Sequence, residues 1–266
     1  MAGILTRWRR RRALARTHID ADLWRRVIAG LPFLRGLGDA DTARLKELAV
    51  QFLDEKTMDG AGGLELTNDI RLSIALQACI PILNLGLDAY VGWVGIIVYP
   101  GEFVVLREEM DENGVLHHVR EQISGEAWPG GPVVLSWQDA KMTDAGYNVV
   151  IHEFAHKLDM LSGQEYLNED DMPLSRRGMD EERWHEVFAK AYDDFCDEVD
   201  SGDETLVDPY AAEHPAEFFA VMSEMFFTHS AVLARDWLDL YGQLALYYLQ
   251  DPAGVLPEVP GTESAP

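Results

Sequence analysis

The stretch "YNVVIHEFAHKLDML", residues 147–161, places two imidazoles and a carboxylate inside an apolar run. Burying such groups is unfavourable unless each finds a partner. His152 and His156 are four positions apart, so a helix brings them to one face, where both can bind the same metal ion. Glu153 then lies beside the ion without binding it, where it can accept a proton from a water molecule. The pattern H-E-x-x-H therefore predicts a metal-binding helix, which we expect over residues 144–160.

A structural explanation of the same pattern is that both histidines lie in the core and bond to backbone or acidic groups. The apolar residues around them exclude a solvated helix but fit either explanation. We favour a metal site, because one ion satisfies both imidazoles together.

A catalytic zinc ion needs a third protein ligand and an open fourth position. Metzincins require glycine and histidine at the positions that Asp159 and Ser162 occupy in this chain, so that subclass is excluded. Glu217 and Glu224 lie in the apolar stretch 214–227, where a carboxylate needs a cation or a metal ion as a partner. They are seven positions apart and share a helix face, so the residues alone leave both as candidates for the third ligand.

Several motifs together resemble one family. They are "GAGGLEL", "IIVYPGEFVV", "GEAW", "GPVVLSW", "GYNVVIHEFAHKLDM" and "YAAEHPAEFFAVMSEMFF", and the resemblance runs from about Trp24 to Asp251. The chain is similar to the Mlc titration factor A family of bacterial zinc peptidases, and its helix pair is similar to the catalytic domain of anthrax lethal factor. The resemblance implies one zinc ion per chain with His152, His156 and Glu217 as ligands, which is the glutamate-ligand (gluzincin) type.

The resemblance also implies roles for residues near the ion. Glu153 is then the general base, and Tyr210, seven residues before the glutamate ligand, matches a tyrosine of the lethal factor site. A phenol keeps its proton at neutral pH and can donate to an oxyanion, although packing or capping would also explain Tyr210. Asp159 shares the face of the two histidines, where it can hold an imidazole N–H or form a salt bridge with a cation such as Arg71. With Glu217 as the ligand, Glu224 is expected beside the site.

The order of helices and strands predicts an α+β fold. Helical spacing predicts a short helix within 21–37 that Gly30 and Pro32 end, a helix over 39–56, and one over 66–87 that is interrupted near Pro81. Strands are expected within 95–106, 115–128 and 131–137, and further helices over 180–200, 214–227 and 231–250. Joined to the resemblance, this order predicts a zincin-like core. It would consist of a small, mostly antiparallel sheet, the H-E-x-x-H helix and the glutamate-ligand helix, preceded by N-terminal helices. The strand at 131–137 is either the edge strand along which a peptide adds or an ordinary core strand.

The expected organisation has three parts. Residues 1–20 form a basic, flexible N-terminus, residues 21–251 form one domain, and residues 252–266 form a disordered, proline-rich tail. Within the domain, 21–90 would be the helical part and 91–251 the catalytic part.

Charge is distributed unevenly along the chain. The net charge is −24, yet residues 1–16 carry six arginines and no acidic residue, which leaves 16 basic and 46 acidic residues, a charge of −30, for the rest. A body this acidic argues against direct nucleic-acid binding, because phosphate contacts need clustered cations. The basic start would then touch an anionic surface, touch the acidic face of the protein itself, or be a solvated tail.

The cysteines and the lengths of the apolar runs indicate the cellular location. Cys79 and Cys196 form no CxxC pair, which favours a reducing compartment. No apolar run reaches the roughly 20 residues that span a bilayer, and no signal-peptide pattern is visible. We therefore expect a cytoplasmic protein without a membrane span.

The sequence thus predicts a zinc metallopeptidase that acts on peptide substrates. The family resemblance implies aminopeptidase-like cleavage of small substrates, and a regulatory role through binding Mlc, a repressor of sugar-uptake genes. The alternative is a non-catalytic, regulatory protein-binding module with a structural zinc ion.

Overall fold

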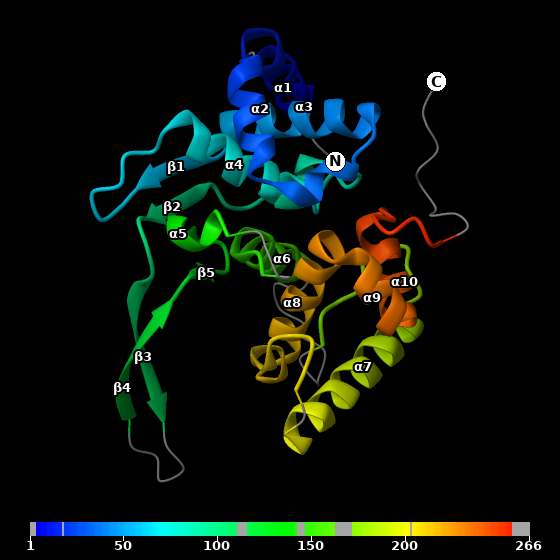
Figure 1. Ribbon diagram of the computed structural model, residues 1–266. Coiled ribbons are helices and arrows are strands. Elements are labelled where there is room, and N and C mark those ends of the chain that lie inside the picture. The colour runs from blue at the N-terminus through cyan, green and yellow to red at the C-terminus, as the bar shows by residue number, and fades with distance from the viewer. Residues whose placement is uncertain are drawn as a thin grey trace.

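A computed structural model describes residues 4–17, 19–110, 116–142, 147–162, 172–202 and 204–256, and it has the expected α+β architecture (Figure 1). The N-terminal part is helical. Its elements are α1 (Ile4–Arg16), α2 (Ala21–Ala29), η1 (Pro32–Gly36), α3 (Asp39–Glu55), α4 (Asn68–Cys79) and η2 (Leu87–Tyr90).

Side-chain caps mark where two of these helices begin. The Asp20 carboxylate accepts the backbone N–H of Leu23 at the start of α2, and the Thr67 hydroxyl accepts that of Ile70 at the start of α4. Helix α4 ends at Cys79, before Pro81, which fits the inability of proline to continue a helix. These local signals place both helices close to their expected positions.

The main sheet has four strands in the order β1-β2-β6-β5. They are β1 (Thr57–Gly60), β2 (Gly95–Tyr99), β5 (Gly125–Ala127) and β6 (Val133–Ser136). The expectation of a mostly antiparallel sheet is wrong, because β1 pairs with β2 and β2 with β6 in parallel, and only β5 and β6 are antiparallel. The reason is the connections: α4 lies between β1 and β2, and a long excursion separates β2 from β6, whereas a short turn joins β5 to β6. Strand β6 is therefore an interior strand and β5 lies at one edge.

A second, two-stranded sheet accounts for the excursion. Strands β3 (Phe103–Met110) and β4 (Leu116–Ile123) form an antiparallel hairpin that extends away from the helices of the C-terminal part (Figure 1). The base of β4 leads directly into β5, so the hairpin is attached next to the edge of the main sheet.

The C-terminal part is again helical. Its elements are α5 (Trp137–Ala140), α6 (Val149–Ser162), α7 (Glu181–Ser201), η3 (Pro209–Ala212), α8 (Pro215–Thr228), α9 (Ser230–Asp236) and α10 (Leu238–Tyr248). The helix expected over 231–250 is divided at Trp237, whose backbone leaves the helical region. The division allows α10 to pack against both α7 and α8.

Helix α6 is buried between the N-terminal helices and α8. Its Phe154 ring lies 5.2–5.7 Å from the rings of Phe52, Tyr90 and Trp93. The opposite face of α6 packs against α8, in the most extensive helix–helix contact among the described residues. The side chain of Asn148 caps α6 by accepting the Ile151 N–H at 2.9 Å.

Within the described ranges, no helix combines the length and the apolar character that crossing a bilayer requires.

Candidate metal centre

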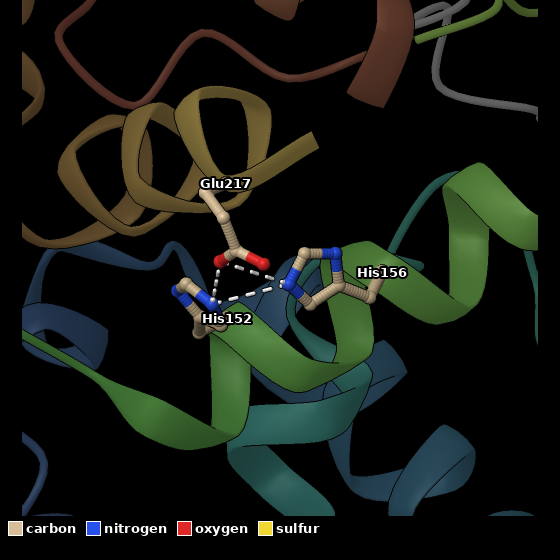
Figure 2. Close-up of side chains that lie close together, drawn as sticks. All are labelled: His152, His156 and Glu217. Carbon is tan, nitrogen blue, oxygen red and sulfur yellow. Dashed lines mark hydrogen bonds and ion pairs between the residues drawn. The ribbon is translucent and has the colours of Figure 1, made fainter. Parts of the chain in front are cut away.

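Three expected side chains meet between α6 and α8 (Figure 2). His152 and His156 extend from α6, and Glu217, in the first turn of α8, extends toward them. His152 Nε2 lies 3.0 Å from Glu217 Oε2 and 3.1 Å from His156 Nε2, and His156 Nε2 lies 3.4 Å from the same carboxylate oxygen. One donor atom from each residue is therefore directed at a common point.

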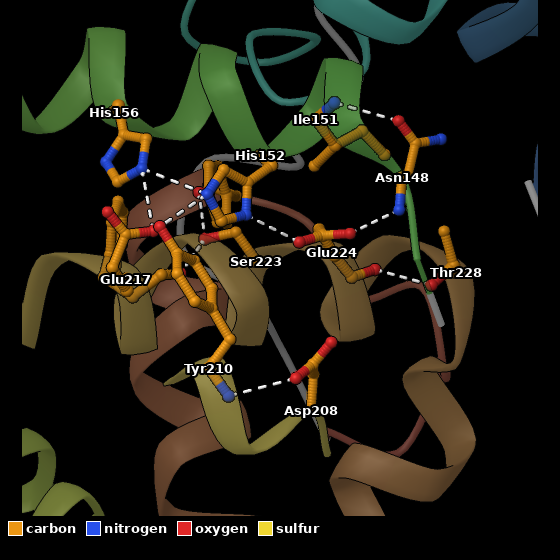
Figure 3. Close-up of polar contacts among 12 residues, drawn as sticks. Asn148, Ile151, His152, His156, Asp208, Tyr210, Glu217, Ser223, Glu224 and Thr228 are labelled. Carbon is orange, nitrogen blue, oxygen red and sulfur yellow. Dashed lines mark hydrogen bonds and ion pairs between the residues drawn. The ribbon is translucent and has the colours of Figure 1, made fainter. Parts of the chain in front are cut away.

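The second glutamate of α8 has a different partner. Glu224 Oε1 lies 2.7 Å from His152 Nδ1, on the far side of the imidazole from Glu217 (Figure 3). A carboxylate accepts at this contact, so Nδ1 carries a hydrogen. Nε2 then either carries the second hydrogen of an imidazolium, which donates to Glu217 at 3.0 Å, or offers a lone pair to a cation held between the two groups. The arrangement therefore suits a cation.

The pKa shifts of His152 and Glu217 also indicate that this position favours positive charge. Burial alone would lower the pKa of His152, but hydrogen bonds to Glu217 and Glu224 outweigh it and hold the pKa well above its usual value. Burial raises the pKa of Glu217, and the hydrogen bonds to His152 and His156 more than reverse this, so the carboxylate stays ionised. The pocket between α6 and α8 thus attracts positive charge.

Glu224 is held by a buried polar chain. Besides His152 it accepts the backbone N–H of Asn148, whose amide donates to Gln77 Oε1 at 2.8 Å. Gln77 in turn donates to the carbonyl of Ala140 at 3.0 Å, and its side chain is fully buried. Each polar group in this hydrogen-bond network has a partner. The network therefore fixes the position of Glu224 and, through Glu224, that of His152.

Glu153 points in another direction, toward the edge of the sheet. It is 5% exposed, and Oε2 has no hydrogen-bond partner within the part of the chain that the structure describes. Burial raises its pKa, the two histidines oppose that rise, and the neighbouring glutamates add to it. A Cβ atom on Gly125 of β5 would lie 2.4 Å from Glu153 Oε1, so glycine is required for this close approach.

Tyr210 lies in η3, at the mouth of the site. Its ring centroid is 6.4 Å from that of His152, and its side chain is 42% exposed. The Asp208 carboxylate accepts the Tyr210 backbone N–H at 3.0 Å and so caps the short helix. Burial and the nearby carboxylates of Glu217 and Glu213 raise the pKa of the phenol, which therefore keeps its proton.

Asp159 lies one turn beyond His156. Burial raises its pKa, while His156, a backbone hydrogen bond with Leu174 and His214 act in the opposite direction. Arg71, named above as a salt-bridge candidate for Asp159, donates to the carbonyl of Met58 at 2.8 Å. Asp159 thus lies near the histidines, and its role stays a prediction.

A cavity of about 530 Å³ opens beside Glu153 and His152. Apolar side chains from α6, α8 and the segment before η3 line it: Val149, Leu206, Val207, Val221 and Met225. Four carboxylates also line it, those of Glu153, Asp208, Glu213 and Glu224, and none of the described residues that line it is a lysine or an arginine. The cavity therefore suits an apolar group and favours positive over negative charge.

Sequence reasoning missed three residues of this region. Gly125 lies within the motif "GEAW", but only the fold shows that it faces Glu153. Gln77 lies in an apolar helix, and its polarity there was the available signal. Tyr147 lines the cavity, and burial raises its pKa to about 12; it had no distinguishing pattern.

Comparison with known proteins adds to the geometry. Residues 5–249 match the model of a family described as glucose-regulated metallo-peptidase M90. A Mlc titration factor A of Pectobacterium atrosepticum is 37% identical over 233 residues, which cover 86% of each chain. Those of Serratia proteamaculans and Escherichia fergusonii are 36% and 34% identical and cover 91–93% of both chains. The resemblance stated from the sequence motifs is confirmed.

Proposed function

Because the chain belongs to the glucose-regulated metallo-peptidase M90 family, we propose that it is a zinc-dependent peptidase with His152, His156 and Glu217 as its ligands. The observation that carries the proposal is the convergence of three donor atoms at 3.0, 3.1 and 3.4 Å from one another. A tetrahedral zinc ion with bonds of about 2.0–2.1 Å spaces its ligand atoms by roughly 3.3–3.4 Å. Two histidines and a glutamate are also a donor set of catalytic zinc sites, which leave the fourth position open.

Zinc in such a site supplies Lewis-acid activation of a water molecule and of the scissile carbonyl. Glu153 accepts the proton of the attacking water and delivers it to the leaving amine. Its place supports this role, since its buried carboxylate borders the cavity and has an oxygen free of other partners within the described part of the chain.

Tyr210 donates its phenolic hydrogen to the oxyanion that forms at the scissile carbonyl. It is partly exposed at the mouth of the site, and its ring lies beside His152. The capping contact from Asp208 holds the backbone of Tyr210, so its side chain begins from a fixed position.

The peptide substrate binds as an extra strand on β5. Directly before and after β5, the Ser124 carbonyl accepts the Ser136 N–H at 2.7 Å and the Trp128 N–H donates to the Pro132 carbonyl at 3.1 Å, so both groups point to the β6 side. By alternation, the backbone groups of Gly125 and Ala127 face the free edge, where an extended peptide can pair with them. Because Gly125 also contacts Glu153, a peptide on this edge passes the general base.

Cleavage is of the aminopeptidase type on small substrates. The cavity supports this in two ways, since its apolar lining accepts a side chain and its carboxylates favour the free ammonium group of a peptide. We further propose that the fold is zincin-like, with residues 21–251 as one domain between a basic N-terminal segment and a C-terminal tail. Cys79 is buried and both cysteines are free, which supports a cytoplasmic location.

A second function is favoured by the relatives. They are named Mlc titration factor A, and we propose that this chain also binds a repressor of that type. Helix α7 offers an acidic outer face, because residues 180–204 contain eleven acidic and two basic residues. A basic surface on the partner would complement it.

The test of the proposed peptidase is hydrolysis of amino-acid and peptide anilides by the purified chain, before and after chelation. The expected result is activity that chelation removes and zinc restores. Glu153→Gln should lower the rate by about 10²–10⁴-fold while retaining zinc and the fold. Unchanged hydrolysis by Glu153→Gln would remove Glu153 from the mechanism. If the variant loses hydrolysis but keeps repressor binding, both functions hold.

A further inference from the structure

Helix α1 concentrates positive charge on a strongly acidic protein. Residues 1–16 contain six of the 22 basic residues and no acidic one, while the rest of the chain carries a charge of −30. Such a segregated distribution is a feature of proteins that attach to an anionic surface through one end.

The helix is fixed to the body by one of its faces. Ala13 is 5% exposed, and α1 packs along α3. Arg10 forms ion pairs of 2.7 Å with Glu55 and 2.8 Å with Asp88, and its side chain is 17% exposed. Arg10 therefore anchors α1 to the body.

The outer face carries four exposed arginines, Arg9, Arg11, Arg12 and Arg16, which we call the arginine arc. None of them has a carboxylate within ion-pair distance among the residues that the structure describes. At about 100° per residue, their order around the helix is Arg11, Trp8, Arg12, Arg16 and Arg9. Trp8 is thus at the interior of the arc; it is 56% exposed, and the Arg12 guanidinium lies 5.1 Å from the centre of its ring.

We propose that the arginine arc and Trp8 bind the surface of a lipid bilayer with anionic headgroups. A helix that lies at such a surface has arginines among the phosphates and tryptophan at the level of the headgroups. Arginines alone would also suit a nucleic acid. The exposed indole at the interior of the arc is instead typical of a helix that lies at the level of lipid headgroups. The acidic body does not prevent the contact, because screening limits its repulsion to about 8–10 Å at moderate salt.

The location of α1 leaves the metal centre accessible. Helix α1 lies at the outer side of the N-terminal helices, well separated from α8 and the hairpin (Figure 1). Attachment through α1 would therefore bring the chain to a membrane without covering the metal centre. This inference does not depend on the proposed peptidase activity.

The experiment is flotation of the full chain with vesicles of phosphatidylcholine alone and with vesicles containing about one third phosphatidylglycerol. The chain should bind the anionic vesicles only, and raising the salt to about 1 M should release it. Each arginine near an anionic surface strengthens binding about fivefold, so R9Q/R11Q/R12Q/R16Q should weaken it by well over tenfold. Trp8→Ala should also weaken it, with circular dichroism confirming that both variants are folded.

A matched control removes the same charge elsewhere. The variant R25Q/R44Q/R177Q/R235Q changes four exposed arginines outside α1 and should bind the vesicles as well as the unmodified chain. Equal binding by the arc variant and the unmodified chain would overturn the proposal, as would failure of the unmodified chain to prefer anionic vesicles. Binding to single- or double-stranded DNA without binding to anionic vesicles would also overturn it, in favour of a nucleic-acid partner.

Discussion

His152 donates its Nδ1 hydrogen to Glu224 over 2.7 Å, so a carboxylate on α8 orients an imidazole on α6. The contact leaves Nε2 of His152 facing Glu217. Two glutamates of one helix, seven residues apart, thus lie on opposite sides of the same ring. This arrangement assigns them different roles in the proposed site.

Replacing Glu224 should weaken metal binding without abolishing it. In Glu224→Ala, His152 loses the partner of its Nδ1 hydrogen, and such outer contacts are worth about 10–100-fold in metal affinity. The buried N–H of Asn148 also loses its acceptor, which should cost about 1–3 kcal/mol of stability. Zinc titration against a competing chelator and thermal unfolding measure the two effects. An unchanged zinc affinity would contradict the orienting role.

Adding one methyl group at Gly125 should impair catalysis. A Cβ there would lie 2.4 Å from Glu153 Oε1 and 2.7 Å from Val149 Cγ2, so Gly125→Ala must displace the base or the strand. We expect a loss of kcat of at least about tenfold with zinc retained. Gly242→Ala is the control, because a Cβ on Gly242 has no atom within 4 Å and alanine favours its helix. Equal activity of the two variants would show that Glu153 tolerates the displacement.

Removing the Tyr210 hydroxyl should reduce the rate selectively. Tyr210→Phe keeps the ring beside His152 but takes away the proposed oxyanion donor, whose loss is worth roughly 10²–10³ in kcat. KM and zinc content should change little. Steady-state kinetics separate the two parameters. A rise in KM at constant kcat would instead indicate that Tyr210 only binds substrate.

Much of this site could be predicted from the sequence. The four-residue spacing of the histidines and the apolar surroundings indicated the helix and the face that carries both imidazoles, because both are local properties. The choice between Glu217 and Glu224 could not be made from the residues, since both share one face of α8 and only the packing of α8 on α6 separates them. The family resemblance supplied that choice.

The sheet shows the same limit. Strand β1 has one buried residue, Met58, and so lacks a readable pattern. Its parallel pairing with β2 depends on the path of the chain through α4, which no local pattern encodes. Gly125 likewise is an ordinary turn-type residue in the sequence, and its contact with Glu153 exists only in the assembled fold.

Lys56 should make the free energy of unfolding vary with pH in the alkaline range. Its ammonium group donates to the carbonyls of Tyr90 and Trp93, and burial lowers its pKa to about 8. Between about pH 8 and 10.5 the unfolded chain still holds this proton and the folded chain does not. The free energy of unfolding should therefore gain a contribution that rises with pH, by at most about 1.4 kcal/mol per unit.

Urea unfolding at several pH values measures this contribution. Lys56→Met should remove it and leave a lower slope against pH over that window, whereas Lys141→Met, at an exposed position, should leave the slope unchanged. The same slope in Lys56→Met and the unmodified chain would contradict the assignment.

In the proposed site, Glu217 holds the metal ion together with His152 and His156. Elemental analysis after saturation with zinc and removal of free ions tests this ligand set. We predict about one zinc per chain in the unmodified protein and in Glu224→Ala, and a loss of zinc in folded Glu217→Ala. A protein that takes up no zinc, or a Glu217→Ala variant that retains it while Glu224→Ala does not, would contradict the account.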